Sequence, residues 1–160
     1  MGGGTLIIAN LGDWTRRMND LAKINRSRSH YWTRGIPTLG VLCMAQPFRR
    51  VVIVTTGSGI GLCLGTLTKL SGTTCRVIWC ASKPEQNFGD LPHQVRKIDP
   101  QALIIDIQGK RKLKLEVLAW RMYTRMKAEA VFCVNNRDVT RKLIYDLESR
   151  GVAFGPIWDS

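Results

Sequence analysis

The chain has 160 residues, 44% of them hydrophobic, which is enough for one domain with a substantial core. No apolar run reaches the roughly 18 residues of a membrane span, and the first residues lack the basic start of a secretory signal. We therefore expect a soluble, cytoplasmic protein. The formal charge is +12, but the basic residues are scattered rather than gathered in a block, which disfavours a nucleic-acid partner.

Residues 1–49 are predicted to form a short strand, a short helix and an extended segment. The strand lies in GTLIIANLG and the helix in DWTRRMNDLAKI, where apolar residues recur at three-residue steps. The extended segment runs through HYWTRGIPTLGVLCMA.

From residue 50 onward, apolar strands alternate with helices. Continuous apolar strands are typical of a parallel sheet that is covered on both faces. The alternation predicts an α/β fold with a doubly wound parallel sheet over residues 50–160. Asn136 or Asp138 is expected to cap the last helix and Gly151 to end it, while His93 is predicted to lie in a surface loop. Strands are predicted in RVVIVTT, CRVIWCAS, QALIIDI, AEAVFCVNN and VAFGPIW, and helices in GIGLCLGTLTKL, LKLEVLAWRMYTRM and DVTRKLIYDLESRG.

The cysteines are odd in number and no two have CxxC spacing. This pattern argues against a disulfide framework and against a zinc site. We expect reduced, mostly buried thiols and no metal site. The cysteines are Cys43, Cys63, Cys75, Cys80 and Cys133.

A glycine-rich turn, TTGSGIG, follows the first strand of the predicted sheet. Glycine allows a sharp bend, and the unpaired N–H groups at a helix start attract an anion. The spacing departs from the G-x-G-x-x-G fingerprint, because Leu62 stands where the third glycine is needed, and the Lys-Ser/Thr of a Walker A loop is absent. Two interpretations stay open: a nucleotide- or anion-binding turn, and a turn that only packs tightly.

Stretches along nearly the whole chain resemble one superfamily. TTGSGIG resembles the T-G-x-G-I-A-P turn that opens the NAD(P)-binding module of ferredoxin reductase-like flavoenzymes. The likeness is stronger to a fungal branch, the TmpA-like membrane oxidoreductases and the C-terminal regions of adenylate-forming, NRPS-like proteins. The matching stretches are NLGDWT, WTRGIPTLGV, FRRVVIVTTGSGIG, RVIWCASKPEQNFG, DPQALIIDIQGKRK, AEAVFCVNN, VTRKLIYDLESRG and GPIWDS.

The resemblance implies a dinucleotide site at the carboxyl ends of the strands. Ser82 and Lys83 take the place of residues that contact the adenosine 2′-phosphate, and Phe88 that of an adenine-stacking ring. Lys83 carries a point charge, so it favours NADP over NAD only weakly. The alternative interpretation is that SKPEQ forms an exposed turn without a binding role. Asn135 and Asn136 end the fourth strand and are candidates for polar contacts. The turn residues implied to bind the cofactor are Thr56, Gly57, Ser58, Gly59, Ile60 and Gly61.

Cys133 lies within one residue of a cysteine that many relatives place beside the nicotinamide. The glycine and proline that follow that cysteine are replaced here by Val and Asn. Two roles of Cys133 stay possible, a residue of the hydride-transfer site and a buried core thiol, and the core thiol is favoured.

The family's flavin lies on an antiparallel barrel that precedes the nucleotide-binding module. Residues 1–49 resemble only the last part of that barrel, and a few strands cannot close one. We therefore expect no flavin held by this chain alone, and the resemblance implies a flavoprotein partner. Uncovered strand edges favour a homodimer.

Two classes of function remain open. The first is an oxidoreductase that binds NADP or NAD in fungal secondary metabolism. The second is a cofactor-independent cyclase or isomerase that acts on a small polyketide- or terpenoid-like substrate in the same cleft. A protein that only binds polyanions ranks third. The candidate catalytic residues are His30, Asp13, Arg34 and Cys133, and the candidate pocket residues are Trp14, Tyr31, Trp32 and Trp158.

Overall fold

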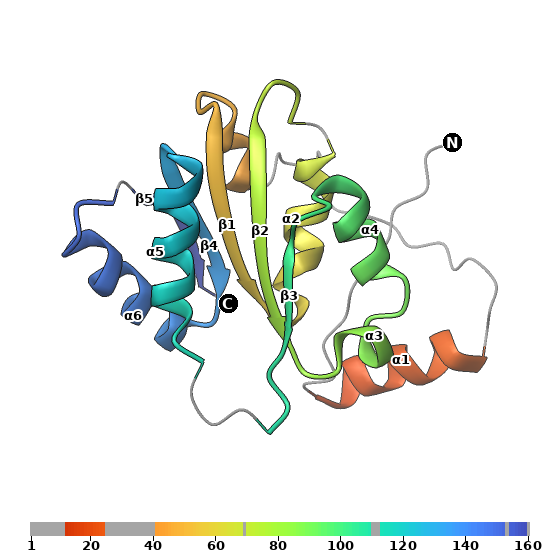
Figure 1. Cartoon of the computed structure of the whole chain (residues 1–160). Coiled ribbons are helices and arrows are strands. Elements are labelled where there is room, and N and C mark those ends of the chain that lie inside the picture. The colour runs from red at the N-terminus through yellow and green to blue at the C-terminus, as the bar shows by residue number, and fades with distance from the viewer. Residues whose placement is uncertain (1–11, 25–40, 69, 110–112, 153, 160) are drawn as a thin grey trace. The chain divides into compact units, whose positions relative to one another are not determined.

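The computed structural model describes residues 12–24, 41–68, 70–109, 113–152 and 154–159 (Figure 1), without the side chains of residues 41 and 154–159. The chain divides into two compact units, Met1–Thr38 and Leu39–Ser160. In the first unit, helix α1 spans Asp13–Ile24, as predicted, and none of its side chains is buried. The predicted strand within residues 4–12, except for Gly12, and most of the extended segment lie outside the described residues.

The second unit is built on a five-stranded sheet in the order β3-β2-β1-β4-β5. Every neighbouring pair of strands is parallel, which confirms the predicted doubly wound sheet. The central strand is buried from Val51 to Thr55, which explains its continuous apolar run. The strands are β1 (Arg50–Thr56), β2 (Thr74–Ala81), β3 (Leu103–Asp106), β4 (Ala130–Asn135) and β5 (Phe154–Asp159).

Helices cover both faces of this sheet (Figure 1). Strand residues alternate between the two cores. On one face, α2 and α4 pack with Ile53, Trp79 and Phe132. On the other face, α5 and α6 pack with Val54 and Cys133. A 3₁₀ helix, η1 (Val41–Ala45), precedes β1. The elements between the strands are η2 (Gly57–Gly59), α2 (Ile60–Leu67), α3 (Pro84–Asn87), α4 (Leu91–Ile98), α5 (Leu115–Met126) and α6 (Arg137–Glu148).

The ends of α6 follow the predicted capping. The Asn136 side chain accepts a hydrogen bond from the Val139 amide at 3.0 Å, so Asn136 rather than Asp138 is the N-cap. Past the other end, Gly151 has φ +75°, a conformation that glycine adopts without strain.

Two segments differ from the predictions. Residues 41–45 form a 3₁₀ helix instead of an extended segment, because Leu42 and Ala45 both turn into the core. His93 lies on the exposed face of helix α4 rather than in a loop, so that prediction is wrong. Pro92 does not break α4, because a proline in the first helical turn loses no hydrogen bond.

The strand order places a switch point between β1 and β4. The chain leaves β1 toward β2 on one side, and β4 lies on the other side. In open α/β sheets, ligands bind outside the carboxyl ends of the strands at such a point. The glycine bend that follows β1 lies at this position.

Candidate functional site

The bend after β1 is open to a ligand at Gly57. Its φ is +54°, and a Cβ added there would meet no atom within 4 Å. The Gly57 carbonyl accepts a hydrogen bond from the indole Nε1 of Trp79 at 2.9 Å, which ties the bend to β2. The bend is therefore held in place while its outer side stays clear.

Gly59 has a different role, because its surroundings leave no room for a side chain. A Cβ there would lie 2.7 Å from Thr55 Oγ1 and 2.7 Å from the Val134 carbonyl oxygen. These two atoms already form a hydrogen bond of 2.9 Å, donated by Thr55, which joins β1 to β4. Close packing therefore requires glycine at position 59. At position 57 the positive φ favours glycine, and the space beside it is open.

The backbone N–H groups of the bend meet no capping side chain within the described ranges. Neither η2, which begins at Gly57, nor α2, which begins at Ile60, has a side-chain cap. Uncapped amides at the positive end of a helix favour an anion. Leu62, which stands where a third glycine would complete the G-x-G-x-x-G fingerprint, is 57% exposed on α2.

At the end of β2, Ser82 and Lys83 are exposed, and Lys83 has φ +43°. The Lys83 N–H donates a hydrogen bond to Asp106 Oδ1 at 3.0 Å, so a carboxylate lies beside this turn. Phe88 is half-buried, and its ring packs edge-on against Trp79 with the centroids 5.1 Å apart. Phe88 thus already has an aromatic partner.

Two buried polar atoms near the start of α6 have no hydrogen-bond partner among the described residues. Asn135 is 4% exposed; its Nδ2 donates to the Val54 carbonyl at 3.4 Å, while its Oδ1 is unpaired. Thr140, on α6, is 2% exposed and its Oγ1 is unpaired. The Asn136 side chain is used as the helix cap, which leaves Asn135 as the better candidate for ligand contact.

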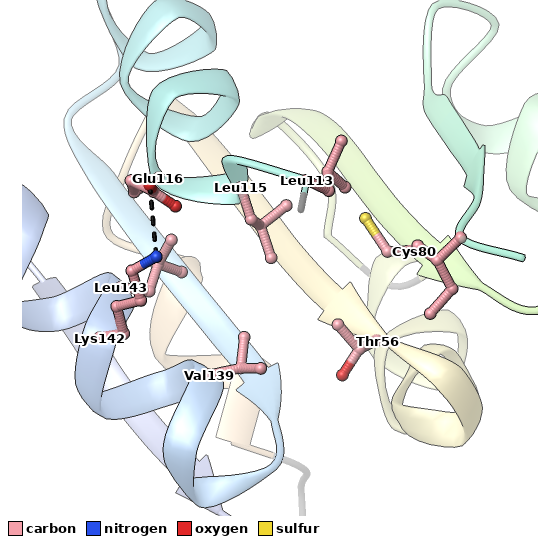
Figure 2. A pocket seen from close by; sticks show the side chains of 9 residues that line it. Thr56, Cys80, Leu113, Leu115, Glu116, Val139, Lys142 and Leu143 are labelled. Carbon is pink, nitrogen blue, oxygen red and sulfur yellow. Dashed lines mark ion pairs between the residues drawn. The ribbon is translucent and has the colours of Figure 1, made fainter. Parts of the chain in front are cut away.

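A cavity of about 300 Å³ lies on the α5–α6 side of the same strand ends (Figure 2). Its polar groups are Thr56, from the end of β1, and an ion pair in which Lys142 Nζ lies 3.5 Å from Glu116 Oε1. Of the bend residues, Thr56 alone belongs to the lining. The remaining lining residues are Cys80, Ile107, Leu113, Leu115, Val139 and Leu143.

Sequence reasoning missed most of this cavity. The helical spacing in residues 113–126 and 138–151 predicts apolar faces turned toward the sheet, but it does not predict a gap between those faces. Glu116 and Lys142 carry no local signal, because they meet only when α5 packs beside α6.

Cys133 is fully buried in the core between the sheet and helices α5 and α6. Burial raises the pKa of its thiol to about 12, and the neighbouring Cys63 adds to this. Burial likewise raises the pKa of Cys63 to about 12, and a hydrogen bond with Thr55 offsets part of this increase. Both thiols stay protonated at neutral pH, which suits the core-thiol interpretation of Cys133.

Two candidate residues of the first unit, Asp13 and Trp14, belong to the described residues. Asp13 is exposed on α1 and pairs with Arg16 at 3.5 Å, and Trp14 is 68% exposed. The side chain of Trp158 lies outside the described residues, although its backbone belongs to β5. The other candidates, which lie wholly outside the described residues, are His30, Tyr31, Trp32 and Arg34.

Two further features of the described ranges bear on membranes and metals. None of the helices there combines the length and the hydrophobicity that crossing a membrane requires. Three or more His, Cys, Asp or Glu side chains placed to hold a metal ion do not occur in this part of the chain either.

Residues 41–160 match the family model of the C-terminal domain of adenylate-forming reductase 03009. The chain belongs to this family. It is 38% identical over 160 residues to adenylate-forming reductase 03009 and 37% identical to adenylate-forming reductase 06235, both from Coprinopsis cinerea. Each alignment covers 99% of this chain but 15% of the relative, so the chain spans a small part of these proteins.

Membership confirms the resemblance to the C-terminal regions of adenylate-forming proteins. The resemblance to TmpA-like oxidoreductases stays a prediction. Among solved structures, a ferredoxin-NADP+ reductase from Plasmodium falciparum aligns with 68% of this chain and 52% of its own chain, at a TM-score of 0.45 and 13% identity.

Proposed function

We propose that this chain is the nicotinamide dinucleotide-binding module of a reductase-like oxidoreductase. The bend at Gly57 carries the proposal: it combines a positive φ, open space for a ligand and uncapped amides at the central strand of a doubly wound sheet. The names of the relatives, which are reductases, agree with this proposal.

The residues around the bend fit such a ligand. The amides of Gly57 and Ser58 would hold the pyrophosphate, and the unpaired Oδ1 of Asn135 would accept a hydrogen bond from an amide or hydroxyl of the cofactor. When bound, the dinucleotide supplies a carrier of hydride. The chain itself supplies binding and orientation, because Trp79 ties the bend to β2 and the Thr55 hydroxyl ties the end of β1, just before the bend, to β4.

The preference for NADP over NAD depends on two opposite charges. The exposed Lys83 would attract a 2′-phosphate, whereas Asp106, which accepts a hydrogen bond from the Lys83 amide, would repel it. We expect a modest preference for NADP. The flexible lysine side chain can move toward the ligand, whereas the Asp106 carboxylate is held by hydrogen bonds from two backbone N–H groups.

A flavin that supplies the electron chemistry would be held elsewhere. The relatives are much longer than this chain, so the flavin would belong to another part of a longer protein or to a partner flavoprotein. The assignment to fungal secondary metabolism is supported by the resemblance alone, and the assignment to the cytoplasm stays an expectation from the sequence.

A fluorescence titration with NADH and with NADPH tests the proposal. Ser58→Asp places a negative charge at the exposed bend and should weaken both complexes about tenfold or more by repulsion of the pyrophosphate. Ser71→Asp makes the same change in the exposed loop before β2, at the opposite end of the sheet, and should leave the affinities within about twofold. Absence of dinucleotide binding by the unmodified chain, or equal effects of the two variants, would contradict it.

A further inference from the structure

The cavity beside Thr56 differs in chemistry from the bend. Its floor consists of aliphatic side chains and a thiol, and Leu115, Leu143 and Cys80 are buried there. The lining also includes Lys142, whose side chain is 65% exposed, and Glu116, whose side chain is 13% exposed. Figure 2 shows these two side chains pointing toward one another. A pyrophosphate would gain little from such a lining, whereas an apolar group would bury its surface.

The size of the cavity limits its occupant. An engineered cavity of about 150 Å³ holds one benzene molecule. A cavity of about 300 Å³ therefore has room for a single ring with a short substituent, or for a branched chain of similar bulk. A long acyl chain or a fused polycyclic compound would extend beyond it into solvent, because the cavity is open on one side.

The charges in the lining favour an uncharged occupant. Glu116 and Lys142 neutralise each other at 3.5 Å, and among the described residues no other charged side chain belongs to the lining. A bound anion would face the Glu116 carboxylate and a bound cation the Lys142 ammonium, so either would lose hydration without a net gain. A neutral oxygen can instead accept a hydrogen bond from Lys142 Nζ or from the Thr56 hydroxyl.

We infer that this cavity binds an uncharged carbonyl compound of about one ring in size, with its apolar part against Leu115 and Leu143 and its oxygen toward Lys142 or Thr56. As the substrate class of the oxidoreductase, this inference rests on the proposed function. The inference that the cavity binds such a compound depends only on the geometry of the cavity. Thr56 links the two sites, because it ends β1 and also lines the cavity.

Four probes with the same number of non-hydrogen atoms separate shape from charge: acetophenone, cumene, benzoate and benzamidine. Binding is followed through the methyl signals of Leu113, Leu115 and Leu143 in a ¹³C-labelled chain, with Leu64 on the opposite face of the sheet as the internal control. Acetophenone should shift the cavity methyls and leave Leu64 unmoved. Cumene should bind about threefold or more weaker, and the two ions about tenfold or more weaker.

Two variants test the site with matched controls. Val139→Trp fills the cavity from α6 and should weaken acetophenone binding about tenfold or more, whereas Ile144→Trp, at a half-buried position on the same helix outside the lining, should leave it within about twofold. Lys142→Met keeps an apolar side chain of similar length on an exposed position. It should remove the preference for acetophenone over cumene, while Lys97→Met on α4 should not.

Shifts spread over both faces of the sheet, tighter binding of benzoate or benzamidine than of acetophenone, or equal effects of the two Trp variants would overturn the inference. NADH and NADPH are titrated separately without a probe, so the two proposals fail independently. Acetophenone binding without dinucleotide binding would retain the cavity site and overturn the substrate role. Dinucleotide binding without acetophenone binding would overturn the cavity site only.

Discussion

Trp79 donates its indole N–H to the carbonyl oxygen of Gly57 across 2.9 Å. Trp79 is fully buried near the carboxyl end of β2, and its ring also packs against Phe88. This contact joins the core of the domain to the proposed ligand site, so the position of the bend depends on the packing beneath it.

Replacement of Trp79 by Phe should destabilise the protein by about 2 kcal/mol or more, because it leaves the Gly57 carbonyl unpaired and a gap in the core. Urea denaturation measures the change. Trp120→Phe is the control, since Trp120 is half-buried on α5 and stacks on Tyr123. A loss for Trp79→Phe no larger than that for Trp120→Phe would contradict the anchoring role.

Two glycine substitutions should have opposite signs. Gly59→Ala forces a Cβ to 2.7 Å from the Val134 carbonyl, so we expect a loss of about 2 kcal/mol or more. Gly65 lies in α2, and a Cβ added there would meet no atom within 4 Å. Gly65→Ala should therefore stabilise the protein by about 0.5–1 kcal/mol. Thermal and urea unfolding check both. Equal effects of the two substitutions would show that the contact at Gly59 relaxes freely.

The buried Cys133 should make the protein less stable in alkali. Burial raises its pKa from 9.0 to about 12, so the thiol ionises in the unfolded chain at a pH where it stays protonated in the folded one. The stabilising effect is complete below about pH 9 and is lost between about pH 9 and 12, at about 1.4 kcal/mol per pH unit.

Urea denaturation of Cys133→Ala between pH 8 and about pH 10.5 should therefore show a shallower loss of stability with pH than the unmodified chain. Val131→Ala, which truncates a buried, non-ionisable side chain on the same strand, should lower the stability and keep the original slope. Identical slopes for Cys133→Ala and the unmodified chain would show that the thiol ionises equally in both states.

Lys83→Gln should lower the affinity for NADPH by about threefold to tenfold and leave that for NADH within about twofold, because only NADPH carries the 2′-phosphate. Lys97→Gln on the exposed surface of α4 is the matched control for a lost positive charge. Isothermal titration with both dinucleotides measures the ratio. A parallel loss for NADH would assign Lys83 to another part of the ligand.

Much of the fold can be predicted from local patterns. The apolar run of β1 and the helical spacing in α5 and α6 identify these elements almost to the residue. Helix α4 was missed although Leu91, Val95 and Ile98 recur at helical steps, because Pro92 and the polar residues around it are typical of a turn. The 3₁₀ helix at residues 41–45 forms only because the core accepts Leu42 and Ala45.

The candidate site was predicted less completely. The sequence identifies a glycine bend after β1, but it cannot tell Gly57 from Gly59. The difference arises from Val134, which belongs to β4 and reaches Gly59 only in the folded sheet. The core position of Cys133 was favoured from its surroundings in the sequence, yet its full burial depends on α5 and α6 packing over β4.

The sequence by itself determined the alternation of strands and helices, the parallel sheet and the location of the glycine bend, because these follow from periodicity and from the conformations open to each residue. Only the tertiary structure decided which glycine faces open space, which polar atoms stay unpaired and where a cavity remains between α5 and α6. Those features depend on how surfaces far apart in the chain fit together, and close packing makes that fit sensitive to every side chain that contributes.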